Sequence, residues 1–179
     1  MRDWKYILKL TGILLAITAI VAALLGFINL LTEERIAANT AEKARAAMET
    51  VLPAGGYTPL ELTEAQKQTG VTEAYLAGDA GYVVRLSRNG FGGAIDLMVG
   101  VKADGTVSGV SIISHAETAS LGANCTREDF RSQFTGKSGP LAVRKDGGEI
   151  DALTGATVTS RAVTEAVNIA LDFVKEVQE

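Results

Sequence analysis

The longest apolar stretch of the chain lies near its N-terminus. No charged residue occurs between Leu10 and Ile28, where Leu, Ile, Ala and Val dominate. As a helix this run reaches about 28 Å, close to the roughly 30 Å hydrocarbon core of a bilayer. The run is too long for the apolar core of a typical signal peptide, and no Ala-x-Ala cleavage site follows it closely. The pattern predicts a retained transmembrane anchor over residues 10–31.

The charges on either side of this anchor indicate its orientation. Three basic residues and one acidic residue precede it, whereas two glutamates and one arginine follow it. Because basic flanks stay in the cytoplasm, residues 1–9 are expected inside and the bulk of the chain outside the cytoplasmic membrane. Residues 32–52 are rich in good helix formers and predict a stalk helix, which Pro53 and the Gly55–Gly56 pair end.

Short apolar runs with turn residues between them follow the stalk. Tyr82–Leu86, Ala94–Val101 and Val107–Ser114 are predicted strands, and the Asp104–Gly105 pair predicts a hairpin between the last two. Leu141–Lys145 is a further candidate strand.

Two helices are predicted in the same region. Thr126–Phe134 is predicted as a short helix with Thr126 as its N-cap and Asp129 in a capping-box-like position. The last helix is expected from about Thr159 to Val177, with one apolar stripe. The stripe consists of Val163, Val167, Ala170, Val174 and Val177. The fold class is therefore α+β, in which one N-terminal transmembrane helix precedes a small antiparallel sheet packed with helices, over residues 53–179.

Composition limits the chemistry available to this domain. The net charge of the chain is −4, and the region after the basic N-terminus is more acidic still, which argues against nucleic acid. The single cysteine, Cys125, cannot form an internal disulfide, and one His with one Cys cannot form a Cys/His zinc site. No metal site and no catalytic residue set is expected. If the domain is redox-active, its cofactor is organic.

The segment Asp151–Ser160 is the main candidate for binding chemistry. It reads D-A-L-T-G-A-T-V-T-S and immediately precedes the last predicted helix. Glycine lets backbone approach a ligand closely, and unpaired amides at a helix start suit a phosphate. An ordinary helix start capped by a hydroxyl side chain is the alternative interpretation.

This segment resembles the flavinylation motif D-x-x-(S/T)-G-A-T of the FMN-binding domain family. Asp151 and Thr154 match its acidic and hydroxyl positions, and Gly155 and Ala156 follow. The resemblance implies that Thr157 carries FMN through a phosphoester and that Thr154, Gly155 and Ala156 help to bind this covalent cofactor. Asp151 would then mark the site for an external flavin transferase, or bind that enzyme's metal.

A second segment, from Ser114 to Gly122, resembles another element of the same family, E-T-P-G-L-G. Ala119 and Ser120 replace its usual Pro and Gly. A polar surface loop is the alternative interpretation. By resemblance, three residues are expected beside the flavin ring or its ribityl chain. They are Glu117, Thr118 and Leu121.

The order of anchor, stalk and terminal motif is similar to the branch of this family that comprises the G subunit of Rnf complexes and the related C subunit of the sodium-pumping NADH:quinone reductase. The resemblance implies an electron-carrying subunit of an ion-translocating ferredoxin:NAD oxidoreductase, whose partners are the other Rnf subunits, a flavin transferase and membrane lipid. The competing hypotheses are a membrane-anchored binding or sensor module without redox function, and an assembly subunit.

Overall fold

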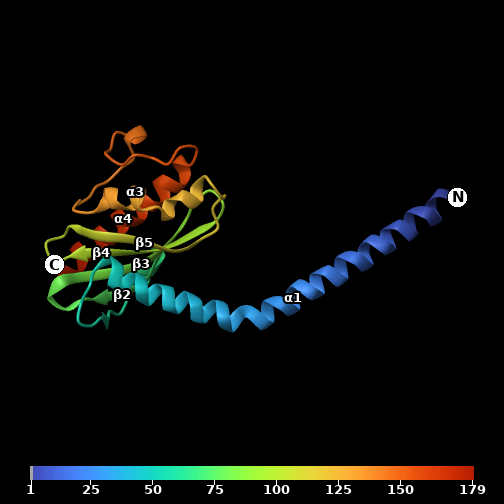
Figure 1. The fold of residues 1–179 in the computed structure, drawn as a ribbon, viewed down its shortest axis with the longest axis horizontal. Helices are drawn as coiled ribbons and strands as arrows, with labels where there is room; N and C mark the ends of the chain where they lie inside the picture. Colours follow the sequence, from blue (N-terminus) through green and yellow to red (C-terminus); the bar gives the residue numbers. More distant parts are fainter. Residues whose placement is uncertain (1) are drawn as a thin grey trace. The chain divides into compact units, whose positions relative to one another are not determined.

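The computed structural model describes residues 2–179 and divides the chain into two compact units, of which the second is Glu42–Glu179. The helix α1 (Arg2–Val51) is continuous, so the predicted anchor runs directly into the predicted stalk (Figure 1). Its segment Trp4–Glu33 is long and apolar enough to cross a membrane. Within it, the hydroxyl of Thr18 donates back to the helix's own carbonyls, which satisfies this polar group in an apolar setting.

The second unit is built on a five-stranded antiparallel sheet in which each strand pairs with its neighbours in sequence. The strands are β1 (Thr58–Pro59), β2 (Val71–Leu76), β3 (Gly81–Asn89), β4 (Ala94–Lys102) and β5 (Val107–His115). The three predicted strands correspond to β3, β4 and β5 and are confirmed. β1 and β2 were not predicted from the sequence.

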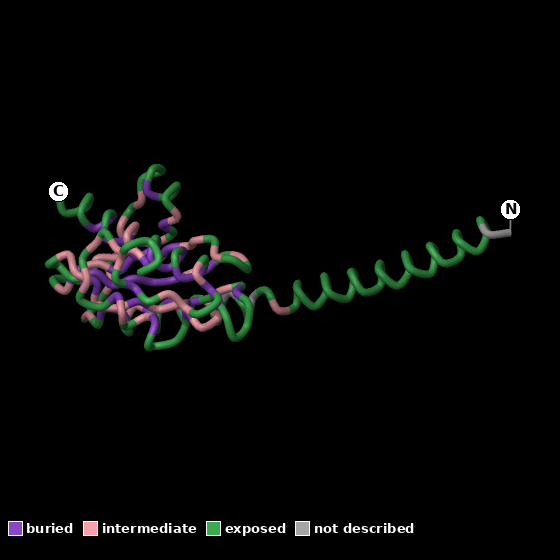
Figure 2. The backbone as a smooth tube through the Cα atoms, turned by 90° about the horizontal axis from the view of Figure 1, so that it is seen from above, coloured by how far each residue is buried: buried purple, intermediate pink, exposed green. Residues whose placement is uncertain are grey.

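One face of the sheet is covered by the helix α4 (Thr157–Gln178), which crosses β3 and β4. Four members of the predicted apolar stripe are buried in this core, whereas Val177 is exposed. The short helices α2 (Glu64–Gln68) and α3 (Glu128–Arg131) complete the α-helices of the unit. Four 3-10 turns connect the elements, at Gly78–Ala80, Gly122–Thr126, Ser132–Phe134 and Arg144–Asp146. Figure 2 shows that the buried backbone lies in the interior of the second unit, whereas the long N-terminal helix is exposed.

The opposite face of the sheet receives the last turns of α1. Ala44, Ala47 and Val51 are buried there together with Met98 from β4. The Val51 carbonyl accepts a hydrogen bond from the Ser108 hydroxyl of β5. The compact unit therefore includes residues 42–52, which the sequence analysis assigned to the stalk.

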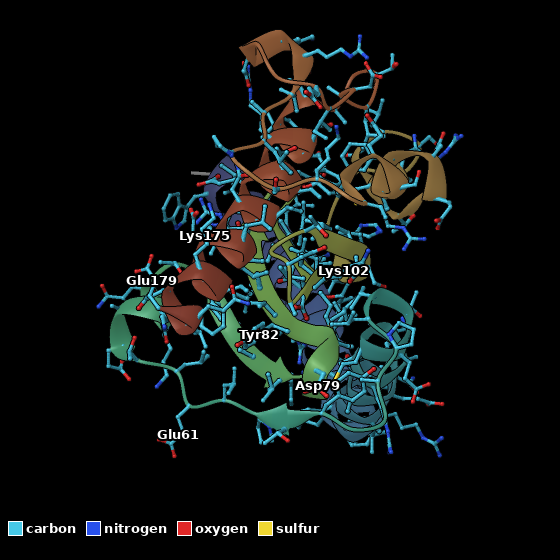
Figure 3. The ribbon with its side chains drawn as sticks, turned by 90° about the vertical axis from the view of Figure 1, so that its left-hand side faces the viewer. Glu61, Asp79, Tyr82, Lys102, Lys175 and Glu179 are labelled. Carbon is cyan, nitrogen blue, oxygen red and sulfur yellow. The ribbon has the colours of Figure 1, made fainter. Side chains whose placement is uncertain are left out.

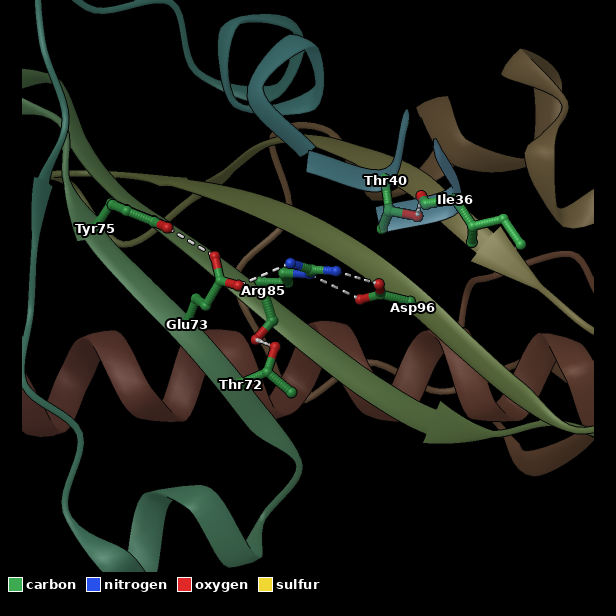
Figure 4. Close-up of polar contacts among 7 residues, drawn as sticks. All are labelled: Ile36, Thr40, Thr72, Glu73, Tyr75, Arg85 and Asp96. Carbon is green, nitrogen blue, oxygen red and sulfur yellow. Dashed lines mark hydrogen bonds and ion pairs between the residues drawn. The ribbon is translucent and has the colours of Figure 1, made fainter. Parts of the chain in front are cut away.

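A charged network occupies another part of this second face (Figure 4). The Arg85 guanidinium donates to both oxygens of Asp96, at 3.1 and 2.6 Å, and to Glu73 at 2.7 Å. Glu73 also accepts from the Tyr75 hydroxyl, and burial together with this carboxylate raises the pKa of Tyr75 to about 12. Because each charge has a partner, the half-buried network ties β2, β3 and β4 together without an isolated ion.

Two local predictions were wrong. Leu141–Lys145 does not form a strand, because only Val143 makes a bridge, with Ile150, before the chain turns at Arg144–Asp146. Thr126 does not cap a helix, since its hydroxyl donates to the Ala123 carbonyl inside a 3-10 turn. α3 instead begins after Arg127, which pairs with Asp129 and so removes the carboxylate that a capping box would need.

Candidate functional site

The candidate site begins at the start of α4. The N-cap residue is Ala156, and no side chain caps the first turn, so the interpretation as an ordinary capped helix start was wrong. The nearby Ser160 hydroxyl accepts from the Leu153 amide and donates to the Ala156 carbonyl. Gly155 has a φ of +75°, and a Cβ there would lie 3.1 Å from Leu121. The positive φ favours glycine at this position, where the two predicted segments come close together.

A cavity of about 400 Å³ lies between these two segments. This volume is within the range of small-molecule sites. The structure therefore brings most of the predicted site residues to one place, although the two segments that contain them are about 40 positions apart in sequence. The lining residues from the two segments are Glu117, Thr118, Leu121 and Gly122, and Gly155, Ala156, Thr157, Val158 and Thr159. Phe91 and Lys145, which the sequence analysis did not identify, complete the lining.

Glu117 holds three segments together around the cavity. Its Oε1 accepts from the backbone amides of Phe91 and Gly92 at 2.8 and 3.1 Å, and its Oε2 accepts from the Thr159 hydroxyl at 2.7 Å. The residue is only 8% exposed. Since both oxygens are engaged by the protein, Glu117 acts as a brace between the glycine-rich bend, its own loop and α4.

Glycines make room for this brace. A Cβ on Gly90 would lie 2.0 Å from Glu117 Oε1, and a Cβ on Gly122 would lie 2.2 Å from Oε2. Neither contact is sterically possible, so glycine at both positions lets the backbone surround the carboxylate. The cluster of glycines at residues 90–93 was the sequence signal that could have identified this part of the site.

The mouth of the cavity is apolar and open to solvent. Phe91 is 75% exposed, Val158 47% and Leu121 44%. Such side chains offer surfaces to a planar aromatic ligand. Lys145 also lines the cavity, and its ammonium donates to the Thr157 hydroxyl at 3.2 Å. The lining thus combines exposed apolar side chains with a hydroxyl, a cation and helix amides that no side chain caps.

The other two motif residues face a different space. Asp151 and Thr154 line a neighbouring cavity of about 630 Å³, which also contacts Leu121. The Asp151 carboxylate forms an ion pair with Arg144 at 2.7 Å, and its side chain is 66% exposed. Asp151 is therefore accessible from outside the protein and lies apart from the Thr157 cavity.

The loop from Thr118 to Leu121 closes through a turn. The Leu121 amide donates to the Thr118 carbonyl at 3.2 Å, and Ser120, the third residue, has a φ of +63°. A turn with positive φ at this position favours Pro followed by Gly. The residues Ala119 and Ser120 therefore adopt a conformation that the usual Pro-Gly of the family would adopt more easily.

His115 and Cys125 lie beside the brace. The His115 Nδ1 accepts from the Glu117 amide at 3.3 Å, and the ring lines a groove between the end of α1 and β5. Cys125 is completely buried. Burial and the nearby Glu117 carboxylate raise the pKa of the thiol to about 11, which keeps it protonated and unreactive at neutral pH.

The residues around the cavity fit a flavin nucleotide. The exposed apolar side chains of the lining match an isoalloxazine ring, and the uncapped helix amides with the Lys145 ammonium match a phosphate. Thr157, whose hydroxyl contacts that ammonium, is half-buried. The chemistry of the donor set therefore agrees with FMN.

Comparison with known proteins supports this agreement. Residues 90–172 match the model of the FMN-binding domain, and residues 1–51 match that of the RnfG N-terminal region. The G subunit of the ion-translocating oxidoreductase complex of Methanosarcina acetivorans is 34% identical over 97% of this chain and 97% of its own. The G subunit of the Na⁺-translocating ferredoxin:NAD⁺ oxidoreductase complex of Acetobacterium woodii is 31% identical over 94% of this chain and 92% of its own.

The fold also resembles a solved structure. The C subunit of the Na⁺-translocating NADH-quinone reductase from Parabacteroides distasonis superposes with a TM-score of 0.55, at 19% identity, over 80% of this chain and 96% of its own. The apolar helix and these membrane-complex relatives agree with a membrane-anchored, single-pass protein. The chain therefore belongs to the family of G subunits of Rnf ion-translocating oxidoreductase complexes and carries an FMN-binding domain.

Proposed function

We propose that this chain is an electron carrier in which FMN is esterified through its phosphate to Thr157. The observation that supports this most directly is the position of the Thr157 hydroxyl. It lies in the lining of the 400 Å³ cavity, at the uncapped start of α4 and against the Lys145 ammonium, together with exposed apolar side chains. A flavin supplies one- and two-electron chemistry when bound, and the protein supplies its position and environment.

Attachment requires an activated flavin donor. Condensation of FMN itself with a hydroxyl would release water and is unfavourable in water, so the donor is a flavin dinucleotide with its phosphate in an anhydride. The Thr157 oxygen forms a bond to this phosphorus, the anhydride P–O bond breaks, and a nucleoside monophosphate leaves. A base of the external flavin transferase takes the hydroxyl proton.

The open cavity explains why a covalent bond is useful. The side chains at its mouth are substantially exposed, so one edge of a bound ring would remain accessible to redox partners. A shallow site binds weakly by itself, whereas a tethered cofactor cannot dissociate between electron transfers. Phe91 and Leu121 would contact the ring, and Glu117 would fix both of their segments.

The family and the charges that flank the span support a proposal for the partners and the location. We place residues 1–9 in the cytoplasm and the FMN-binding domain outside the cytoplasmic membrane, because the basic flank precedes the span. The domain would exchange electrons with the other subunits of an Rnf complex, while lipid surrounds the anchor.

Substitutions at Thr157 test the attachment. The full chain is coexpressed with a flavin transferase, and intact mass and in-gel flavin fluorescence are measured. Thr157→Ala abolishes labelling and Thr157→Ser retains it, whereas Thr72→Ala, at an exposed threonine of β2 outside the cavity, serves as a control that labels normally. Fluorescence that survives in Thr157→Ala contradicts the proposal. A wild-type protein that stays colourless supports the non-redox binding or assembly module instead.

Asp151 has a separate role in the proposal, as a recognition point for the transferase or its metal. It is exposed and faces the neighbouring cavity, which Asp129 also lines. Asp151→Ala should reduce labelling without changing thermal stability, whereas the matched control Asp129→Ala should label normally. Equal labelling of the two variants removes this role from Asp151.

A further inference from the structure

The Lys145 side chain contacts the proposed acceptor directly. Its ammonium donates to the Thr157 hydroxyl at 3.2 Å, across twelve positions of sequence. In the described residues Lys145 takes no part in an ion pair, although both of its neighbours in the chain do. A positive charge that forms no direct ion pair in the described residues is thus held against the hydroxyl that would become a phosphoester.

The neighbours of Lys145 fix its position. On one side, Arg144 pairs with Asp151, the first residue of the motif. On the other side, Asp146 accepts two hydrogen bonds from the Arg161 guanidinium of α4, at 2.7 and 2.6 Å. The two-bond Arg161–Asp146 pair is stronger than the single Arg144–Asp151 contact. It holds the pKa of the Asp146 carboxyl below its ordinary value.

The backbone of the turn is restrained as well. The Arg144 amide donates to the Ile150 carbonyl at 2.9 Å, and the Gly148 amide donates to the Val143 carbonyl at 3.1 Å. Gly147 has a φ of +86°, and a Cβ on Gly148 would lie 2.0 Å from the Ala142 carbonyl oxygen. Both glycines are therefore required for the chain to fold back so tightly. The turn is a fixed support from which Lys145 reaches Thr157.

We propose that Lys145 is a positioning residue for flavin attachment, which orients the Thr157 hydroxyl toward the cavity and then pairs with the phosphate bonded to that oxygen. This inference rests on the proposed function. Before attachment, the ammonium fixes the hydroxyl for reaction with the incoming phosphorus. After attachment, it balances the negative charge of the ester, which the helix amides balance only in part.

The test compares loading rates of the full chain in detergent. Wild type, Lys145→Gln, Lys145→Arg and Lys175→Gln are incubated with a flavin transferase and flavin dinucleotide, and loading is followed by intact mass. Lys175 is a matched control because it lies near the far end of α4, about 27 Å along the helix from Thr157 (Figure 3). Lys145→Gln should lower kcat about tenfold and change KM for the acceptor protein by less than about twofold.

Lys145→Arg should load with a kcat close to that of wild type, and Lys175→Gln should load like wild type. In the loaded proteins, the ³¹P resonance of the ester should shift in Lys145→Gln and not in Lys175→Gln. Wild-type loading by Lys145→Gln, or equal losses in the Gln and Arg variants together with a lower melting temperature, overturns the inference alone. A wild-type chain that does not load at all overturns the proposed function as well.

Discussion

The turn at Ser120 allows a stability prediction with a definite sign. Ser120 is exposed and has a φ of +63°, the left-handed region that costs a residue with a Cβ about 1–2 kcal/mol. Ser120→Gly removes this strain but adds backbone entropy to the unfolded chain, worth about 0.5–1 kcal/mol in the opposite direction. The net gain should be about 0.5–1 kcal/mol, or about 2–3 °C in the melting temperature.

Thermal unfolding of the unloaded full chain, followed by circular dichroism, measures this gain. Ser132→Gly is the matched control, because Ser132 is also exposed but has an ordinary φ of −63°. Glycine there should lower the melting temperature by about 2–3 °C. If both substitutions lower it by similar amounts, the strain assigned to Ser120 is absent and the reasoning fails.

Three further predictions concern the brace, the thiol and acid stability. Glu117→Ala leaves two amides and a hydroxyl without their acceptor and should lower the free energy of unfolding in urea by about 2–4 kcal/mol. Glu117→Gln should lower it by less. A change below about 0.5 kcal/mol would show that the brace contributes little to stability. The buried Cys125, with its pKa raised to about 11, should resist a thiol reagent at about pH 8 until urea is added, and rapid labelling of the native protein would be inconsistent with this burial. Arginine partners hold the pKa values of Asp146 and Glu165 below their ordinary values, so these pairs stabilise the fold above about pH 5 and stop doing so as the pH falls through the lowered values. The melting temperature should therefore fall between about pH 5 and pH 3, and a rise on acidification would contradict this assignment.

The predictable parts of the fold are those with a regular pattern. The apolar run identified the anchor, short apolar runs bounded by turns such as Asp104–Gly105 identified β3 to β5, and periodicity identified α4. β2 was missed because polar residues interrupt its apolar positions, and Glu73 takes part in an ion network that only the folded sheet brings together. Local patterns cannot report a partner that lies elsewhere in the sequence.

The same limit applies to the site. The motif containing Thr157 and the loop containing Glu117 were recognised, but not the contacts that join them. Lys145 carries no local signal, because a lysine in a charged turn is usually a solvated side chain. Phe91 similarly becomes part of a cavity only because the Glu117 carboxylate binds its amide. Long-range pairing, rather than any motif, defines the complete cavity.

The covalent bond at Thr157 is the claim from which the electron-carrier role and the role of Lys145 both follow. Intact mass of the full chain, purified from membranes in which the flavin transferase is active, tests it most directly. An FMN ester at Thr157 gives a mass increase equal to one FMN minus one water, located by peptide mapping to the segment that contains Thr157. An unmodified chain, or a flavin located on another residue, would contradict it.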